Sequence, residues 1–429
     1  MLSCGGGQIN ISIVSAFFLM LFSPVVLSTP LNIILNDALR NDPGIKEAYA
    51  DFESARDRIE QSRSAHWPKI VAIGTQPISK KNLYDTESNH FDPRLSAEMN
   101  LYSFGAIEFD VKKNKHNAGF YRYKLAEKYE ETAYEIISLY FDALKEKKAI
   151  EVLNRSLVRH QSILNDLDSI AFHDKGRESE YVQAKARKLL VEQQINNRYL
   201  ALESTLSKIS TYTKKQVKES DLDDIFNSNS AESLIHKYKS NIRSENPSYL
   251  AQQENLESKR MELAAEKRIN LPRLDLNGTV TRDNKEISLN IKWDLFNRST
   301  GYNIKEKISQ VDSASSRVDS VIRDIDETRR ISEIIINQTI KEISILLSQI
   351  KESESVVDFY KLQFQVARKT LIEVLNSQSE LSNVELQYVE SQNRLNHGLL
   401  DYLRSQGAIT QWCCSNITQE LKNEGVYLP

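Results

Sequence analysis

The residue types that most often carry out chemistry in proteins occur here without a spacing that would assemble a reactive site. Short-spaced histidines and cysteines are typical of zinc sites, but the seven histidines lie far apart, at positions 66, 90, 116, 160, 173, 236 and 397. The sequence contains no glycine-rich phosphate loop of the kind that binds nucleotides. The run Gly5-Gly6-Gly7 falls in the N-terminal leader. We therefore expect neither a metal site nor a nucleotide site.

Carboxylates are plentiful, but they alternate with basic residues. The 59 Asp and Glu residues are balanced by 56 Lys and Arg residues, which leaves a net charge of −3. This balance gives no electrostatic reason to expect nucleic acid or an anionic membrane surface as a partner. Because most carboxylates fall on helix-like segments among Lys and Arg, a solvated helix face is the simpler interpretation. We predict that the protein is not an enzyme and has no cofactor.

The three cysteines are too few for a disulfide framework. Cys4 lies in the leader, and Cys413 and Cys414 are adjacent near the C-terminus. A C-terminal tail without function is the simplest interpretation of that pair.

The elements around these residues are mostly helical, but two segments show the alternation of β-strands. In Leu274–Val280 and Ile287–Trp293, apolar and polar residues alternate, and a polar turn joins them. This period of two predicts a hairpin at about 273–296 with one apolar face. A second hairpin is predicted at about 69–103, with a weak first strand from Ile70, a polar loop from about 79 to 93, and a clear second strand over Leu95–Tyr102.

The remaining segments predict long helices. Apolar residues recur at spacings of three and four, which is typical of coiled-coil seams. We expect helices over 36–65, 105–172, 179–208, 299–368 and 372–406. A helix of about 65 residues extends roughly 100 Å at 1.5 Å per residue, so these helices would form a rod or tube.

The chain repeats itself once. Pro43 and Pro68 are 25 positions apart, and so are Pro247 and Pro272. Each pair precedes a hairpin, a long helix, a break and a second helix. We expect five segments, namely a signal peptide (1–28), a first repeat (29–208), an equatorial linker (209–243), a second repeat (244–407) and a C-terminal tail (408–429).

The N-terminus has the apolar run of a secretory signal peptide, from Ile9 to Leu27, with Thr29 as the predicted mature start. Its first eight residues contain no Lys or Arg. An uncleaved membrane anchor is the alternative. After Leu27 no further run is long and apolar enough for a transmembrane helix.

Strands of this length suit a tilted crossing of a bilayer. Four strands cannot close into a barrel, and open edges in lipid would leave backbone groups unsatisfied. Other copies of the chain must therefore complete the sheet. Two copies would give a barrel filled by its own side chains, so a channel favours three.

Aromatic residues flank the predicted strands at their helix-side ends. They are Trp67, Tyr102, Phe104, Trp293 and Phe296. Membrane barrels carry aromatic girdles at this level. The alternative is that these residues form the core of a soluble domain.

The sequence resembles the TolC-type outer membrane factors from about Leu31 to Ile409. The matching segments are residues 38–43, the two proline–hairpin units, and residues 139–144, 176–184 and 369–376. The resemblance implies a mostly α fold with β-hairpins, in which a homotrimer forms a twelve-stranded transmembrane barrel in the outer membrane and an α-helical barrel in the periplasm. It also implies docking to a periplasmic adaptor (membrane fusion) protein and to an inner-membrane ABC transporter or another pump.

The resemblance further implies that the helix–turn–helix tips, here 173–184 and 364–376, close the periplasmic end. Glu373 matches an acidic residue of the family's constriction and would form a ring that selects cations; a solvated helix-face carboxylate is the alternative. Asn376 stands where the family has a second acid, Phe364 where it has a tyrosine, and Lys369 where it has a basic residue. The expected adaptor contacts are Gly176, Arg177, Glu178, Ser179, Lys369 and Thr370.

Residues 176–184 resemble the branch that serves type I secretion of large proteins. Multidrug efflux is the alternative. A periplasmic coiled-coil rod would explain the helices but would leave the amphipathic strands unexplained.

Overall fold

The computed structural model describes residues 30–76, 78, 91–171, 177–213, 216–225, 231–239, 246–414, 417 and 419. The strands are β1 (Lys69–Thr75), β2 (Asp92–Tyr102), β3 (Arg273–Val280) and β4 (Lys285–Lys292). The helices are α1 (Pro30–Asn41), α2 (Pro43–Arg63), α3 (Ala106–Ala171), α4 (Glu178–Tyr212), α5 (Ala231–Lys237), α7 (Pro247–Ile269), α8 (Arg298–Gln365), α9 (Leu371–Gln406) and α10 (Ile409–Cys413), with short 3₁₀ turns at Ser64–His66 and Glu219–Asp221. The predicted signal peptide, Gly176 and most of the polar loop predicted from 79 to 93 lie outside the described residues. The prediction of a mostly helical fold with β-hairpins is confirmed.

One predicted helix is in fact two. The helix expected over 36–65 is interrupted at Asp42, where α1 ends and α2 begins. A residue before proline is disfavoured in the helical conformation, and Asp42 has ψ 126° before Pro43. Its side chain caps α2 by accepting a hydrogen bond of 2.9 Å from the Ile45 amide. Asn246 caps α7 before Pro247 in the same way, through the amides of Ser248 and Tyr249.

The four strands form one antiparallel sheet in the order β1-β2-β3-β4. Its register places Met99, Leu276 and Leu289 side by side, and Asn100, Asp275 and Asn290 in the next row. Since successive side chains point to opposite faces, one face is apolar and the other polar. No described residue covers the apolar face, since Ile287 is 82% exposed and Leu289 is 59% exposed.

The hairpin formed by β3 and β4 ends before its predicted end at 296. β4 ends at Lys292, so Trp293 and Phe296 lie in the connection to α8 rather than in the strand. Asn297 ends this connection by accepting a hydrogen bond from the Ser299 amide as the cap of α8.

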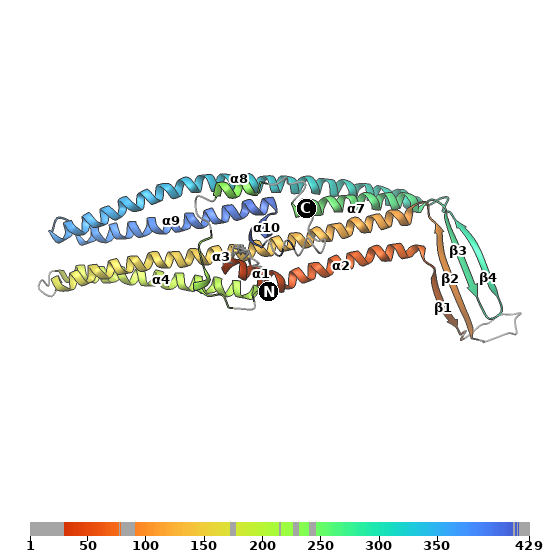
Figure 1. Ribbon diagram of the computed structural model, residues 1–429, viewed down its shortest axis with the longest axis horizontal. Coiled ribbons are helices and arrows are strands. Elements are labelled where there is room, and N and C mark those ends of the chain that lie inside the picture. The colour runs from red at the N-terminus through yellow and green to blue at the C-terminus, as the bar shows by residue number, and fades with distance from the viewer. Residues whose placement is uncertain are drawn as a thin grey trace, which may run out of the picture.

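Figure 1 shows an elongated molecule with the sheet at one end and, at the other, the ends of the helix pairs α3–α4 and α8–α9. α3 and α8 have 66 and 68 residues, which corresponds to roughly 100 Å each. α2 and α7 pack beside them near the sheet, and α4 and α9 pack beside them toward the far end. Long helices thus connect the sheet to the opposite end of the molecule. None of its described helices is long and apolar enough to cross a membrane.

The main hydrophobic core lies at the middle of the helices. Leu35, Tyr140 and Leu403 are fully buried there, and the core joins α1, α3 and α9. The Tyr140 hydroxyl accepts a hydrogen bond of 2.7 Å from the Asp223 amide, in the segment between α4 and α5. The predicted equatorial linker therefore packs against the core. α4 itself continues to Tyr212, past its predicted end at 208.

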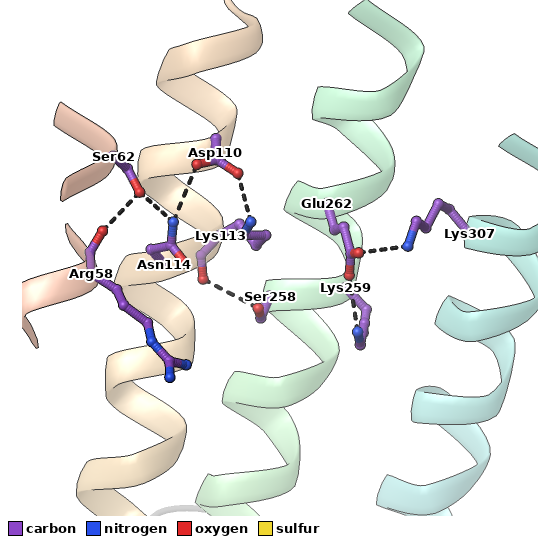
Figure 2. A network of polar contacts seen from close by, with 9 residues as sticks. All are labelled: Arg58, Ser62, Asp110, Lys113, Asn114, Ser258, Lys259, Glu262 and Lys307. Atoms are coloured by element: carbon purple, nitrogen blue, oxygen red, sulfur yellow. Dashed lines mark hydrogen bonds and ion pairs between the residues drawn. The ribbon is translucent and has the colours of Figure 1, made fainter. Parts of the chain in front are cut away.

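Nearer the sheet, polar contacts connect four helices in sequence (Figure 2). Asn114 of α3 donates to the Ser62 hydroxyl of α2. Ser258 of α7 donates to the Lys113 carbonyl of α3 over 3.1 Å. Lys307 of α8 lies 2.7 Å from Glu262 of α7. These contacts fix the helices against one another where they approach the sheet.

Candidate functional site

The turn between α8 and α9 has a defined geometry built from local contacts. The Arg368 amide donates 2.8 Å to the Gln363 carbonyl, and the Ala367 amide donates 3.0 Å to the Phe364 carbonyl. This pair of hydrogen bonds is a Schellman motif, in which the residue after the helix usually adopts a left-handed conformation. Ala367 has φ +56° there. The motif ends α8 at Gln365, three residues before its predicted end at 368.

Glu373 closes the first turn of α9. Its carboxylate accepts hydrogen bonds from the Thr370 amide over 2.9 Å and from the Thr370 hydroxyl over 3.0 Å. The Glu373 amide in turn donates to the Thr370 hydroxyl oxygen. These reciprocal contacts form a capping box, whose sequence signature is Ser or Thr followed three residues later by Glu or Gln. The sequence Thr370-Leu371-Ile372-Glu373 carried that signal, and our sequence interpretation did not use it.

Lys369 pairs with the same carboxylate. The Lys369 ammonium lies 2.7 Å from Glu373 Oε1 and 4.3 Å from the centre of the Tyr360 ring. The hydrogen bond from Lys369, together with those from Thr370, lowers the pKa of Glu373 to about 2. The same contact raises the pKa of Lys369. Glu373 is therefore ionised and paired with Lys369.

A small hydrophobic cluster joins the helix pair α3–α4 to the helix pair α8–α9 at the end opposite the sheet. Its buried members come from three helices: Ile163, Leu164 and Leu167 of α3, Ala184 of α4, and Leu371, Val374 and Leu375 of α9. Phe364 of α8 packs against this cluster. The Arg177 guanidinium lies 6.0 Å from the centre of the Phe364 ring, at the edge of cation–π range. Phe364 thus makes apolar and cation–π contacts at the position where the resemblance implied a tyrosine.

The described residues that are expected to contact an adaptor lie at the start of α4 and between α8 and α9. Arg177, Glu178 and Ser179 form the start of α4, and Glu178 and Ser179 are exposed. Arg177 also lies 4.0 Å from Glu180. Asn376 is exposed and lines a groove of about 540 Å³ between α4 and α9, with Arg187 on its other side. The predicted tip residues that the structure describes lie at or next to the start of α4, the end of α8 and the start of α9. These helix ends lie opposite the sheet (Figure 1).

A buried ionic cluster between α3 and α9 was not predicted from the sequence. Glu385 is 5% exposed, and Arg159 donates to it over 2.8 Å while Arg155 donates over 3.2 Å. Next to it, Ser382 donates 2.8 Å to the hydroxyl of Ser156. The available signal was weak: Glu385 falls among the apolar seam residues of α9, but its partners lie more than 200 positions away.

The predicted aromatic residues gather at the junction of sheet and helices. Trp67 lies two residues before β1, and Tyr102 ends β2. The rings of Tyr102 and Phe104 are 4.8 Å apart. All five predicted side chains, including Trp293 and Phe296, are exposed in the chain. They are therefore not part of the hydrophobic core of the single chain.

The described residues contain no group of three or more His, Cys, Asp or Glu side chains that could hold a metal ion. His160 is buried and shares a hydrogen bond of 2.9 Å with the Ser156 carbonyl, and burial lowers its pKa. His116 lies 2.8 Å from Glu254, and His397 lies 3.3 Å from Asp142. These histidines each take part in a helix–helix contact or a local hydrogen bond.

Comparison with known proteins gives a partial family match and the fold. Residues 34–209 match the family model described as "Outer membrane efflux protein". No curated protein sequence matches the chain.

Several solved outer membrane proteins share the fold. The chain superposes with a TM-score of 0.77 on the outer-membrane channel OprN, at 16% identity, covering 88% of this chain and 90% of that one. The CmeC outer membrane channel of Campylobacter jejuni gives a TM-score of 0.77 at 15% identity, with 92% and 89% covered. The outer membrane protein VceC of Vibrio cholerae gives 0.76 at 13% identity, with 88% and 96% covered. Part of the chain, residues 34–209, therefore matches the outer membrane efflux protein family, and the described chain has the fold of solved outer membrane channels.

Proposed function

We propose that three copies of this chain form the outer-membrane conduit of a tripartite export system. In this proposal the protein is a passive channel. A periplasmic adaptor protein docks at its tips, and an inner-membrane ABC transporter or another pump supplies energy and substrate. The observation that carries the proposal is the apolar sheet face, which is left uncovered by the part of the chain that the structure describes.

The sheet favours both a lipid environment and association with other copies. Its edge strands, β1 and β4, each have one side without a partner strand in the order β1-β2-β3-β4. Open edges in lipid would leave backbone groups unsatisfied. Three copies would close these edges into a twelve-stranded barrel, with the exposed Trp67, Trp293 and Phe296 at its periplasmic rim.

The helices offer a second surface for neighbouring copies. Large apolar side chains are exposed along α4 and α8, including Val182, Leu189, Leu200, Ile334, Ile345, Phe359 and Leu362. Exposed apolar area of this extent indicates an interaction surface. Packing of α4 and α8 against adjacent copies would complete an α-helical barrel around a central tunnel. A lone periplasmic rod would leave both this surface and the sheet face in water.

A pair of arginine substitutions on one strand tests the membrane assignment. Leu289→Arg puts a charge on the apolar face, and Asn290→Arg puts the same charge on the polar face. Arginine on the lipid face of a barrel costs about 2–4 kcal/mol near the bilayer midplane. We expect L289R to abolish recovery of trimers from outer membranes, and N290R to leave trimers and their conductance in planar bilayers intact. Equal recovery of the two variants would contradict the proposal.

Within this function we propose type I protein secretion as the transport branch. The support is the resemblance of residues 176–184, of which Arg177 to Ala184 are described at the tip. The description of the matched family as efflux proteins favours multidrug efflux as the second candidate. Deletion of the gene separates them: loss of one large secreted protein supports type I secretion, whereas increased sensitivity to several drugs supports efflux.

A further inference from the structure

The two adjacent cysteines form a tight pair inside the helical core. Cys413 is the last residue of α10, and Cys414 follows it. Their sulfur atoms are 2.9 Å apart, within about 1 Å of the length of an S–S bond. Cys413 and Cys414 are 6% and 2% exposed. They are the only cysteines among the described residues.

Contacts around α10 hold this pair in place. The Glu130 carboxylate of α3 accepts hydrogen bonds from the amides of Ile409 over 2.8 Å and Thr410 over 2.9 Å. An anion at the N-terminus of a helix is stabilised by its unpaired amides and its dipole. At the other end, the Cys414 amide donates 2.8 Å to the Thr410 carbonyl. Both cysteines belong to the main hydrophobic core. The sulfur–sulfur contact is therefore part of a well-packed segment and not of a free tail.

The compartment favours oxidation. In the proposed channel the helices lie in the periplasm, a compartment in which disulfides form and persist. We propose that Cys413 and Cys414 are joined in the mature protein by a disulfide between neighbouring residues. This proposal rests on the proposed function for the periplasmic location of the helices, but not on which substrate the channel carries.

The bond would form by thiol–disulfide exchange with a periplasmic oxidoreductase in its disulfide form. The thiolate of one cysteine attacks the carrier disulfide, which gives a mixed disulfide and releases one carrier thiolate. The thiolate of the other cysteine then attacks the chain's own sulfur in the mixed disulfide. The S–S bond between Cys413 and Cys414 forms, and the carrier leaves as a dithiol that has gained two electrons and two protons.

The exchange must precede the docking of α10. In the folded chain, burial raises the pKa of the Cys413 thiol, and only a thiolate attacks a disulfide. Both sulfurs are also inaccessible to a carrier protein once the core has formed. The segment that contains the pair would therefore be oxidised during assembly and then buried.

Mass spectrometry of the full-length protein from outer membranes tests this inference. Cells are quenched in acid, and the protein is denatured with an alkylating reagent present and then digested with trypsin, which releases both cysteines in the peptide 405–422. We expect a peptide lighter by two hydrogen atoms and not alkylated, which gains two alkyl groups only after reduction. Two alkylated cysteines without reduction would overturn the proposal, and so would a disulfide to another chain.

Two controls make the result specific. In Cys413→Ser and Cys414→Ser, the remaining thiol should be alkylated without reduction, which shows that the reagent reaches this peptide. In a host without periplasmic thiol oxidase, grown without oxygen, the wild-type peptide should become doubly alkylated. A pair that stays oxidised in that host would contradict the proposed exchange.

Discussion

Arg159 of α3 donates a hydrogen bond of 2.8 Å to Glu385 of α9, and this contact joins two helices that lead to different tips. Glu385 is almost fully buried, whereas Arg159 and Arg155 keep part of their side chains in solvent. A buried carboxylate is tolerated only with such partners, because its desolvation is costly. The cluster thus fixes the pairing of α3 with α9.

We predict that Glu385→Gln destabilises the helical part by about 2–3 kcal/mol. The substitution leaves Arg159 without its anionic partner, and breaking a fully buried pair typically costs about 3–5 kcal/mol; the partial exposure of both arginines reduces this value. Thermal unfolding of the detergent-solubilised protein, followed by circular dichroism, measures the loss. Glu390→Gln, at an exposed position of the same helix, should change stability by less than about 0.5 kcal/mol. Equal effects of the two substitutions would show that the cluster is not stabilising.

A second prediction concerns the backbone of the α8–α9 turn. Ala367 has φ +56°, a conformation that costs an L-residue with a Cβ atom roughly 1 kcal/mol or more relative to glycine. Ala367→Gly should therefore stabilise the turn by about 0.5–1 kcal/mol, and Gln363→Gly, in the last helical turn of α8, should destabilise it by about 1 kcal/mol. Hydrogen exchange of the amides around 366–371 distinguishes them. A loss of protection in both variants would contradict the left-handed conformation at Ala367.

Local sequence patterns predicted most of the fold for physical reasons. The alternation in Ile287–Ile291 reflects the pleat of a strand, so it gave both the strand and its apolar face. The spacing of three and four along α3 and α8 gave the long helices in the same way. The break at Asp42 was equally local, since Pro43 disfavours a helical residue before it, and it was missed by interpretation and not for lack of signal.

The contacts between distant segments could not be read from the sequence. Arg159 and Glu385 are 226 positions apart. Arg177 contacts the Phe364 ring only because the start of α4 packs near the end of α8. Such pairs depend on tertiary packing, which no local pattern encodes. The capping box of Thr370 and Glu373 is intermediate: its signature is local, but its pairing with Lys369 had to be seen in three dimensions. The division into two repeats and the role of Glu373 in a constriction stay predictions.

The lowered pKa of Glu373 predicts how the α8–α9 turn responds to acid. Its pKa falls from 4.5 to about 2 on folding. A group whose pKa is lowered on folding contributes stability above its unfolded pKa, and this contribution is lost as the pH falls toward the folded pKa. The capping box should therefore be fully effective above about pH 4.5 and weaken progressively toward about pH 2.

Hydrogen exchange of residues 371–376, corrected for intrinsic rates, measures this response in the wild type and in Glu373→Gln. We expect protection in the wild type to exceed that in E373Q at neutral pH, and the difference to disappear as the pH falls through this window. The variant controls for every other group that titrates in acid. A difference that stays constant over the window would show that the Glu373 carboxylate does not stabilise the turn.

The pairing of Lys369 with Glu373 also predicts ion selectivity, given the proposed trimer. Because the ammonium and carboxylate are 2.7 Å apart, a ring of three pairs presents little net charge to the tunnel. Lys369→Met would leave three unpaired carboxylates, and Glu373→Gln would leave three unpaired ammonium groups. Charged rings select ions of opposite sign. We therefore expect K369M to increase the preference for cations and E373Q to decrease it.

Reversal potentials in planar bilayers under a salt gradient measure both shifts on the same channel. The double variant K369M/E373Q restores a neutral ring, so its selectivity should return close to that of the wild type. This return separates a local charge effect from a change in the shape of the turn, which would persist in the double variant. If neither single variant changes the reversal potential, Lys369 and Glu373 do not line the constriction. If both shift it in the same direction, the charge of the pair does not control selectivity.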